Sequence, residues 1–162
     1  MTEFEGLVAI VTGGASGIGA AAAGLLAERG ARVVVLDRDV SMVNPAVTSL
    51  VADVTSSADV EEAVETVVER FGAVDILVNN AGIGAVGDAS ANSDDEWHRV
   101  FDVNVVGIVR LTRAALPYLR TSDHAAIVNT CSVVAAVGVP QRAVYAASKG
   151  AVAALTLAMA AD

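Results

Sequence analysis

Short apolar runs recur along the chain at intervals that suit buried strands. Five of them are rich in β-branched residues and continuous rather than alternating, which is typical of strands buried on both faces. They are Leu7–Val11, Arg32–Leu36, Ser49–Ala52, Asp75–Val78 and Ala126–Asn129. The pattern therefore predicts five strands of a parallel sheet.

Helical patterns of apolar residues lie between these runs. One stripe over residues 18–26 stops at Gly30, and another over residues 60–71 follows Ser57, a candidate N-cap, and stops at Gly72. The segment between the second and third runs is short and contains Pro45. We expect only a turn or a brief helix there, because proline interrupts helices.

A third helical pattern opens with the capping box Ser93–Glu96. The polar Asn104 falls on its apolar stripe, and a buried amide needs partners, so it is either a satisfied structural asparagine or a functional one. Strand and helix alternate throughout, which predicts an α/β fold with a doubly wound parallel sheet and right-handed crossovers. The side chains that the third helix points inward are Trp97, Val100, Phe101, Val105, Ile108 and Leu111.

Composition is consistent with a single domain over residues 1–162. The chain has 162 residues, of which 54% are hydrophobic, and this is enough to bury a core. A net charge of −9 with scattered Lys and Arg argues against nucleic acid as a partner. No apolar stretch reaches the roughly 20 residues that cross a membrane, and the acidic N-terminus does not resemble a signal peptide. We therefore expect no membrane partner and a cytoplasmic location.

The sequence contains a single cysteine, Cys131. It excludes an internal disulfide and has no metal-ligand spacing with His98 or His124. We expect no metal site.

The stretch TGGASGIG, Thr12–Gly19, directly follows the first apolar run. A strand, a glycine-rich turn and a helix place free backbone N–H groups and the positive end of a helix dipole at the carboxyl edge of the sheet, which suits a pyrophosphate. Glycine lets the backbone approach the phosphates and allows φ > 0. The order Gly13-x-x-x-Gly17-x-Gly19 differs from G-x-G-x-x-G, and the Gly-Lys-Ser/Thr of a P-loop is missing. A dinucleotide site is predicted, with a purely structural turn as the alternative.

Asp37 ends the second apolar run, VVVLD, roughly 20 residues after the glycine-rich turn. A carboxylate there accepts hydrogen bonds from the adenosine ribose hydroxyls and repels a 2′-phosphate. NAD is therefore favoured over NADP. Arg38 follows directly and weakens this preference, because an arginine nearby accommodates the additional phosphate.

Tyr145 and Lys149 are four residues apart in a helical pattern and so lie on one helix face. An ammonium beside a phenol stabilises the phenolate, which lets a tyrosine act as a general acid or base closer to neutral pH. Ser132 follows the last apolar run, at the same sheet edge, where it could hydrogen-bond a substrate oxygen. Each feature alone is commonly a surface pair or a cap, so their combination carries the interpretation.

Together these residues resemble the short-chain dehydrogenase/reductase family. The resemblance runs along essentially the whole chain in the family's order, and Gly-x-x-x-Gly-x-Gly is that family's form of the pyrophosphate turn. It implies a Rossmann fold with strand order 3-2-1-4-5 and hydride transfer between a nicotinamide cofactor and an alcohol or ketone. The matching features are TGGASGIG, Asp37, the pair Asp53–Val54, NNAG at Asn79–Gly82, Asn104, Ser132, Tyr145 and Lys149.

The resemblance also implies a role for each matching residue. Tyr145 would be the general acid or base, Lys149 would lower the tyrosine pKa and hold the nicotinamide ribose, Ser132 would orient the substrate oxygen, and Asn104 would anchor a relay water. The implied cofactor contacts are Gly13, Ser16, Gly17, Ile18 and Gly19 at the pyrophosphate, Asp37 at the ribose, Asp53 and Val54 at the adenine, and Asn80, Ala81 and Gly82 on the other side.

The chain stops inside the helix that carries Tyr145 and Lys149, whereas the family has a sixth and a seventh strand and a substrate-closing region. We expect the chain to be part of a longer protein, with a natural truncation as the alternative. Without those parts, a dinucleotide-binding or interaction module without turnover is a second functional class.

The helix AVYAASKGAVAALTLAMA is apolar on more than one face, which predicts contact with another subunit or burial within the monomer. The resemblance similarly implies a homodimer or homotetramer through this helix and its neighbour at Asp95–Leu116. The local residues Val133, Val134 and Gln141 indicate a partly apolar entrance and leave the substrate open among sugars, steroids, acyl thioesters and diols.

Overall fold

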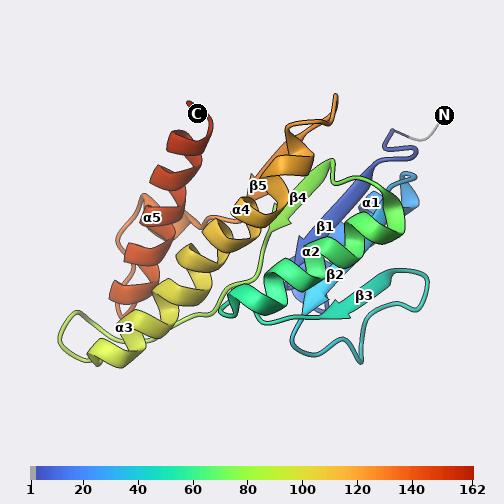
Figure 1. The fold of residues 1–162 in the computed structure, drawn as a ribbon. Helices are drawn as coiled ribbons and strands as arrows, with labels where there is room; N and C mark the ends of the chain where they lie inside the picture. The colour runs from blue at the N-terminus through green and yellow to red at the C-terminus, as the bar shows by residue number, and fades with distance from the viewer. Residues whose placement is uncertain (1–2) are drawn as a thin grey trace.

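The computed structural model describes residues 3–162, and five parallel strands form its sheet in the order β3-β2-β1-β4-β5 (Figure 1). This confirms the predicted fold class and strand order. No predicted strand boundary moves by more than one residue. The strands are β1 Val8–Thr12, β2 Arg32–Asp37, β3 Thr48–Val51, β4 Ile76–Asn79 and β5 Ala126–Asn129.

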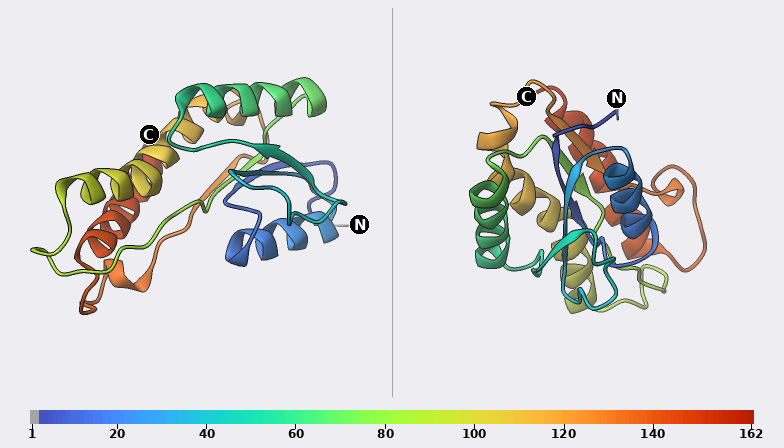
Figure 2. Two further views of the ribbon diagram at one scale, coloured as in Figure 1. Left: turned by 90° about the horizontal axis from the view of Figure 1, so that it is seen from below. Right: turned by 90° about the vertical axis from the view of Figure 1, so that its right-hand side faces the viewer.

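Helices cover both faces of the sheet (Figure 2). The helix α1 (Gly17–Glu28) packs on one face, and α2 (Ser57–Phe71) and α4 (Gly107–Leu119) pack on the other. Successive residues of β1 alternate between the two cores: Val8 and Ile10 face α2 and α4, whereas Ala9 and Val11 face α1. Burial on both faces explains why the strand sequences are continuously apolar.

The start of α2 differs by one residue from the prediction. The N-cap is Ser56, whose Oγ accepts a hydrogen bond from Asp59 N–H at 3.2 Å, whereas the predicted cap Ser57 is already the first helical residue. Adjacent serines look alike in the sequence, and the backbone conformation selects one. The predicted stop at Gly72 is confirmed, and its φ of +80° ends the helix in the left-handed region.

The third predicted helix is divided into three parts. The segments α3 (Asp94–Phe101) and α4 enclose a π-helical segment η1 (Asp102–Val106) that carries Asn104. Ser93 caps α3 as predicted, with its Oγ accepting a hydrogen bond from Glu96 N–H. In a capping box the glutamate carboxylate would accept from Ser93 N–H, whereas the Glu96 carboxylate accepts from Asn92 Nδ2 at 2.8 Å. An extra residue in a helical turn is often associated with functional sites.

The last helix, α5 (Ala143–Met159), packs against η1 and α3. The strand β5 forms the edge of the sheet, and Val128 on it is 51% exposed. Residues 38–47 form turns, as expected from Pro45. Within residues 3–162, every helix is too short or too polar to cross a membrane.

A buried carboxylate joins the first strand to the amino end of β4. Asp75 is 9% exposed, and its Oδ2 accepts a hydrogen bond from Val8 N–H at 2.8 Å while its Oδ1 accepts one from Ser122 Oγ. The substitution Asp75→Ala leaves the Val8 N–H without this acceptor and should lower the free energy of unfolding by about 1–3 kcal/mol. Urea titration checks this. Ser122→Ala removes only one of the two bonds and should cost less; equal midpoints for wild type and Asp75→Ala would contradict the assignment.

Candidate active site

A cleft of about 720 Å³ runs along the carboxyl edge of the sheet, where doubly wound folds bind ligands. Its wall is formed by the end of β2, by the segments after β1, β3, β4 and β5, by the first turns of α1 and α5, and by residues of α3 and η1. Thirteen of the fifteen predicted site residues line it, and Gly19 and Asn104 lie behind the wall. The thirteen are Gly13, Ser16, Gly17, Ile18, Asp37, Asp53, Val54, Asn80, Ala81, Gly82, Ser132, Tyr145 and Lys149.

The glycines of the turn after β1 have two different functions. Gly13 has φ +62°, and a Cβ there would lie 2.8 Å from Ala81 Cα, while a Cβ on Gly19 would collide with the Gly13 carbonyl. Gly17 has φ +54° and open space where its Cβ would be. Ser16, the N-cap of α1, forms no side-chain capping bond. The first turn of α1 therefore presents uncapped N–H groups beside a glycine surface, which fits a pyrophosphate.

Hydrogen bonds tie this turn to the NNAG segment after β4. Thr12 Oγ1 accepts from Asn80 N–H and from Ala81 N–H, each at 3.0 Å. Asn80 Nδ2 donates to the carbonyl oxygens of Thr12 and Gly13 at 3.2 and 3.1 Å. The Asn80 side chain thus holds the turn, and its place in the cleft wall follows from that position.

Asp37 faces the turn from the end of β2. Its Oδ2 accepts a hydrogen bond from Ala15 N–H at 3.1 Å, and its Oδ1 accepts one from Arg38 N–H at 2.8 Å. A carboxylate has about four acceptor sites, so both oxygens can still accept from a ligand hydroxyl.

Asp53 lies after β3 on the same side of the cleft. The backbone and side chain of Thr55 donate hydrogen bonds to its Oδ1 at 2.8 and 2.7 Å and, with the charge of Arg38, hold the pKa of Asp53 below its usual value. Its neighbour Val54 backs onto α4, where a Cβ on Gly107 would lie 3.1 Å from the Val54 side chain. The adenine side of the predicted site therefore combines a fixed anion with an apolar contact.

Tyr145 and Lys149 lie together in the first turns of α5, as the four-residue spacing predicts. Lys149 Nζ is 5.9 Å from the centre of the Tyr145 ring and donates to the Thr130 carbonyl at 2.7 Å. Only 4% of Lys149 is exposed. Loss of hydration lowers the pKa of its ammonium below 10.5, and the nearby Cys131 offsets part of this effect.

Ser132 caps a short 3₁₀ turn, η2 (Val133–Ala135), and its Oγ accepts from Val134 N–H at 3.4 Å. The preceding Cys131 also lines the cleft, and its Sγ donates to the Lys149 carbonyl at 3.2 Å. The strand β5 therefore delivers both side chains to the same part of the wall as Tyr145.

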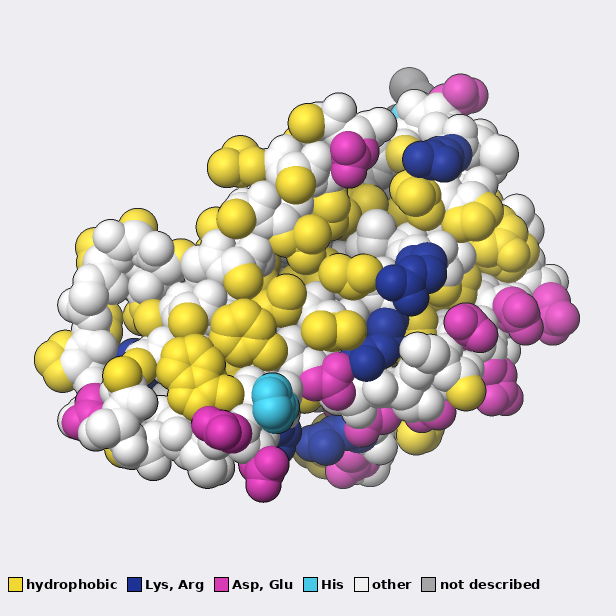
Figure 3. Space-filling view, turned by 60° about the vertical axis from the view of Figure 1, so that its left-hand side comes forward, with side chains coloured by type: hydrophobic (Ala, Val, Ile, Leu, Met, Phe, Trp, Pro, Cys, Tyr) yellow, Lys and Arg dark blue, Asp and Glu magenta, His cyan; other side chains and the backbone are white. Residues whose placement is uncertain are grey.

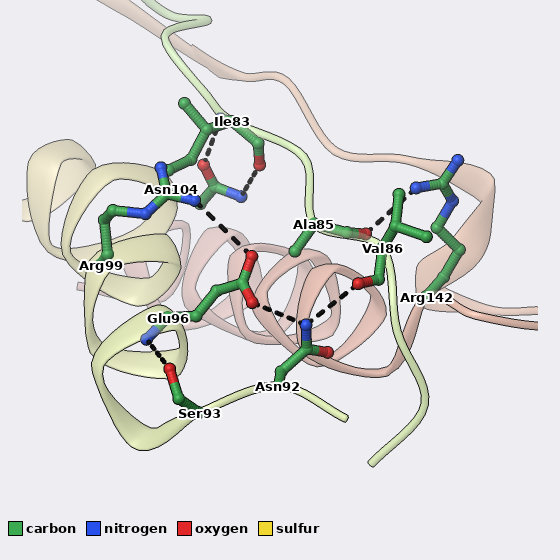
Figure 4. A network of polar contacts seen from close by, with 9 residues as sticks. All are labelled: Ile83, Ala85, Val86, Asn92, Ser93, Glu96, Arg99, Asn104 and Arg142. Atoms are coloured by element: carbon green, nitrogen blue, oxygen red, sulfur yellow. Dashed lines mark hydrogen bonds and ion pairs between the residues drawn. The ribbon is translucent and has the colours of Figure 1, made fainter. Parts of the chain in front are cut away.

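Asn104 is fully buried, and its amide is engaged at both ends (Figure 4). Oδ1 accepts from Ile83 N–H at 2.8 Å, and Nδ2 donates to the Ile83 carbonyl at 2.9 Å and to Ser148 Oγ at 3.0 Å. A Cβ on Gly82 would lie 3.3 Å from Asn104 Oδ1 and 3.5 Å from Lys149 Nζ, so Gly82 lies between these two side chains. The structural alternative for Asn104 is thus supported by its contacts.

Ten residues of the cleft wall were not among the predicted site residues. Most of them are sequence neighbours of a predicted site residue, so their place along the chain could have identified them. Arg99 and Val103 come from α3 and η1, which only the folded chain brings to the cleft. The ten are Leu36, Arg38, Ala52, Thr55, Ile83, Gly84, Arg99, Val103, Thr130 and Cys131.

Within residues 3–162, no group of three or more His, Cys, Asp or Glu side chains is placed to hold an ion.

Comparison with known proteins gives a consistent result. The short chain dehydrogenase family profile matches residues 7–162. The chain is 39% identical to the L-fucose dehydrogenase of Bos taurus, over 99% of this chain and 62% of that protein, and 36% identical to the 3-ketodihydrosphingosine reductase of Bacteroides thetaiotaomicron, over 90% and 54%. It therefore spans less than two thirds of the length of these relatives.

Comparison with solved structures points to the same family. The ligand-free aldohexose dehydrogenase of Thermoplasma acidophilum superimposes with a TM-score of 0.94 at 33% identity, covering 99% of this chain and 63% of that one. A short chain dehydrogenase/reductase from Burkholderia phymatum in complex with NAD gives 0.89 at 36% identity, covering 98% and 60%. The chain therefore belongs to the short-chain dehydrogenase family of oxidoreductases.

Proposed function

We propose that this protein transfers a hydride between a nicotinamide dinucleotide and an alcohol or ketone, with Tyr145 as the general acid and base. One observation carries the proposal: the Tyr145–Lys149 pair lines the same cleft as the glycine-rich turn and Asp37, although these segments lie at opposite ends of the chain. Their juxtaposition gives one cavity both an anion site and a proton-transfer group.

The nicotinamide, when bound, supplies the hydride acceptor for oxidation and the hydride donor for reduction. During oxidation the Tyr145 phenolate takes the hydroxyl proton of the substrate, and during reduction the phenol returns a proton to the carbonyl oxygen. Lys149 stabilises the phenolate by its charge and holds the nicotinamide ribose. Ser132 donates a hydrogen bond to the substrate oxygen and stabilises its negative charge.

The remaining cleft residues would bind the dinucleotide. The turn from Gly13 to Gly19 would hold the pyrophosphate, Asp37 the adenosine ribose, Asp53–Val54 the adenine, and Asn80–Gly82 the other side. Because Asn104 uses its amide on Ile83 and Ser148, a relay water would meet this residue through its backbone in η1. The charge of Asp37 favours NAD over NADP.

We propose that residues 1–162 belong to a single dinucleotide-binding domain and that the protein forms a homodimer or homotetramer through α4 and α5. Figure 3 shows hydrophobic side chains gathered over the face that α3, α4 and α5 form. Val106 in η1 and Leu157 in α5 are 40% and 75% exposed. Apolar surface of this kind favours contact with another subunit.

Removal of the Tyr145 hydroxyl tests the reaction. Tyr145→Phe should lower kcat with NAD and secondary alcohols by about 10²–10⁴-fold, the range of a general acid–base contribution, and leave NAD affinity within about twofold. Steady-state kinetics and fluorescence titration measure both. Tyr118→Phe, on α4 outside the cleft lining, is the matched control and should behave as wild type. Unchanged turnover in Tyr145→Phe defeats the proposal, and NAD binding without any turnover in wild type supports the non-catalytic module.

Cofactor choice depends on the Asp37 charge. Asp37→Asn retains an acceptor oxygen for Ala15 N–H but removes the repulsion of a 2′-phosphate. We expect the ratio of NAD to NADP affinity to fall by about tenfold, on the order of a single charge–charge term. Dissociation constants for both cofactors measure it. A ratio that stays constant would assign the preference to other residues.

The buried ammonium predicts a pH dependence of stability. Because the pKa of Lys149 is lowered in the folded state, the folded protein releases this proton before the unfolded chain does, and the cost of the buried charge then disappears. The free energy of unfolding of wild type relative to Lys149→Met should rise as the pH increases through the alkaline range toward 10.5, the ordinary pKa of a lysine. Urea titrations across this range measure the difference, and a decrease with pH would refute the assignment.

A further inference from the structure

We infer that Ser148 is a positioning residue that holds Asn104 against the helix bearing Tyr145 and Lys149. The inference rests on the proposed function. Ser148 is fully buried, its Oγ accepts a hydrogen bond from Asn104 Nδ2 at 3.0 Å, and it donates to the Tyr145 carbonyl at 2.8 Å. It lies outside the cleft lining and reaches the site only through its neighbours.

The donor and acceptor inventory shows why a hydroxyl is needed at this position. An asparagine Nδ2 has two hydrogens, and here one goes to the Ile83 carbonyl and the other to Ser148. Removal of the hydroxyl leaves a buried N–H without its acceptor, which is costly. The contacts Ile83–Asn104–Ser148 form a continuous connection, called the brace below, from the loop after β4 through η1 to α5.

The composition of α5 supports the same inference. Most small residues of this helix are alanine, the strongest helix former, and a fully buried small position would ordinarily take alanine as well. Serine has lower helix propensity and competes for backbone hydrogen bonds. The hydrogen bond that the Ser148 hydroxyl accepts from the Asn104 amide explains why a serine occupies this position.

The brace acts on the part of the cleft next to the catalytic pair. Asn104 Oδ1 and Lys149 Nζ both lie beside Gly82. The next residue, Ile83, is hydrogen-bonded to Asn104 and lines the cleft. A shift of Asn104 away from α5 would therefore move the cleft wall relative to Tyr145 and Lys149. Misplacement of this kind lowers the rate of a reaction that depends on orientation more than it lowers ground-state binding.

A second attachment holds the outer part of the same loop (Figure 4). Arg142 Nη1 donates to the Ala85 carbonyl at 3.1 Å, and Gly87 forms backbone hydrogen bonds with Gln141 and Ala143. These contacts fasten the loop to the start of α5, so Ser148→Ala should release the inner segment around Ile83 without detaching the whole loop.

The test compares Ser148→Ala with Thr156→Val in the full-length protein. Thr156 offers a control of the same kind because its Oγ1 also accepts from an asparagine, the partly buried Asn129, and donates to a carbonyl of α5, Val152. It lies near the far end of α5 and outside the cleft lining. Any general cost of losing a helix hydroxyl appears in both variants.

Two measurements are made on each variant: kcat and KM for NAD and a secondary alcohol, and amide hydrogen exchange at Ile83 in the protein without cofactor. Ser148→Ala should lower kcat by about tenfold with KM for NAD changed less than about twofold, and should raise exchange at Ile83. Thr156→Val should change neither. Ser148→Cys, which keeps a weak acceptor, should fall between wild type and Ser148→Ala.

Failure of the inference and failure of the proposed function give different results. Wild-type turnover that disappears in Tyr145→Phe, with Ser148→Ala as active as Thr156→Val, overturns the inference alone. Absence of turnover in wild type overturns the proposed function, and exchange then decides the brace: raised exchange at Ile83 in Ser148→Ala supports it, and unchanged exchange overturns it.

Discussion

The hydroxyl of Thr12 joins the two strand ends on which the site depends. It accepts the N–H groups of Asn80 and Ala81, and Asn80 in turn donates to the carbonyls of Thr12 and Gly13. The glycine-rich turn and the NNAG segment are therefore one hydrogen-bonded unit. Gly13 is tightly packed within this unit, which is why a side chain there would have to displace backbone. The cleft exists because two central parallel strands end together and are locked at that point.

The lining of the cleft carries charges of both signs, and the backbone at the start of α1 lies beside it. The lining contains the anions Asp37 and Asp53 toward the ends of β2 and β3, and the cations Arg38, Arg99 and Lys149. Between them, the start of α1 offers uncapped N–H groups and a helix dipole. In a protein with a net charge of −9, local dipoles of this kind favour an anionic ligand in the cleft, as the proposed function requires. The buried polar groups of Asn104, Ser148 and Lys149 each have a hydrogen-bond partner, which offsets the cost of their burial.

Much of the fold could be read from the sequence because burial on both faces leaves continuous β-branched runs, and glycines stop helices where the chain must turn. The sequence also predicted that the motif residues gather at one edge of the sheet, and thirteen of the fifteen line one cleft there. Other features depended on competition between nearly equal local choices. Ser56 and Ser57 are equivalent in sequence, and only the backbone shows which one caps α2. Likewise, no residue pattern distinguishes a π turn from a continuous helix at Asp102–Val106.

The sequence by itself determined the order of strands and helices, the glycine-rich turn and the spacing of Tyr145 and Lys149, because these depend on periodicity and local geometry. The tertiary structure alone decided where Asn104 sends its amide, that Ser148 accepts from it, and that Arg99 and Val103 reach the cleft wall. These contacts join residues that are distant along the chain. A hydrogen bond between such residues is set by how helices pack on the sheet, and no short stretch of sequence records that packing.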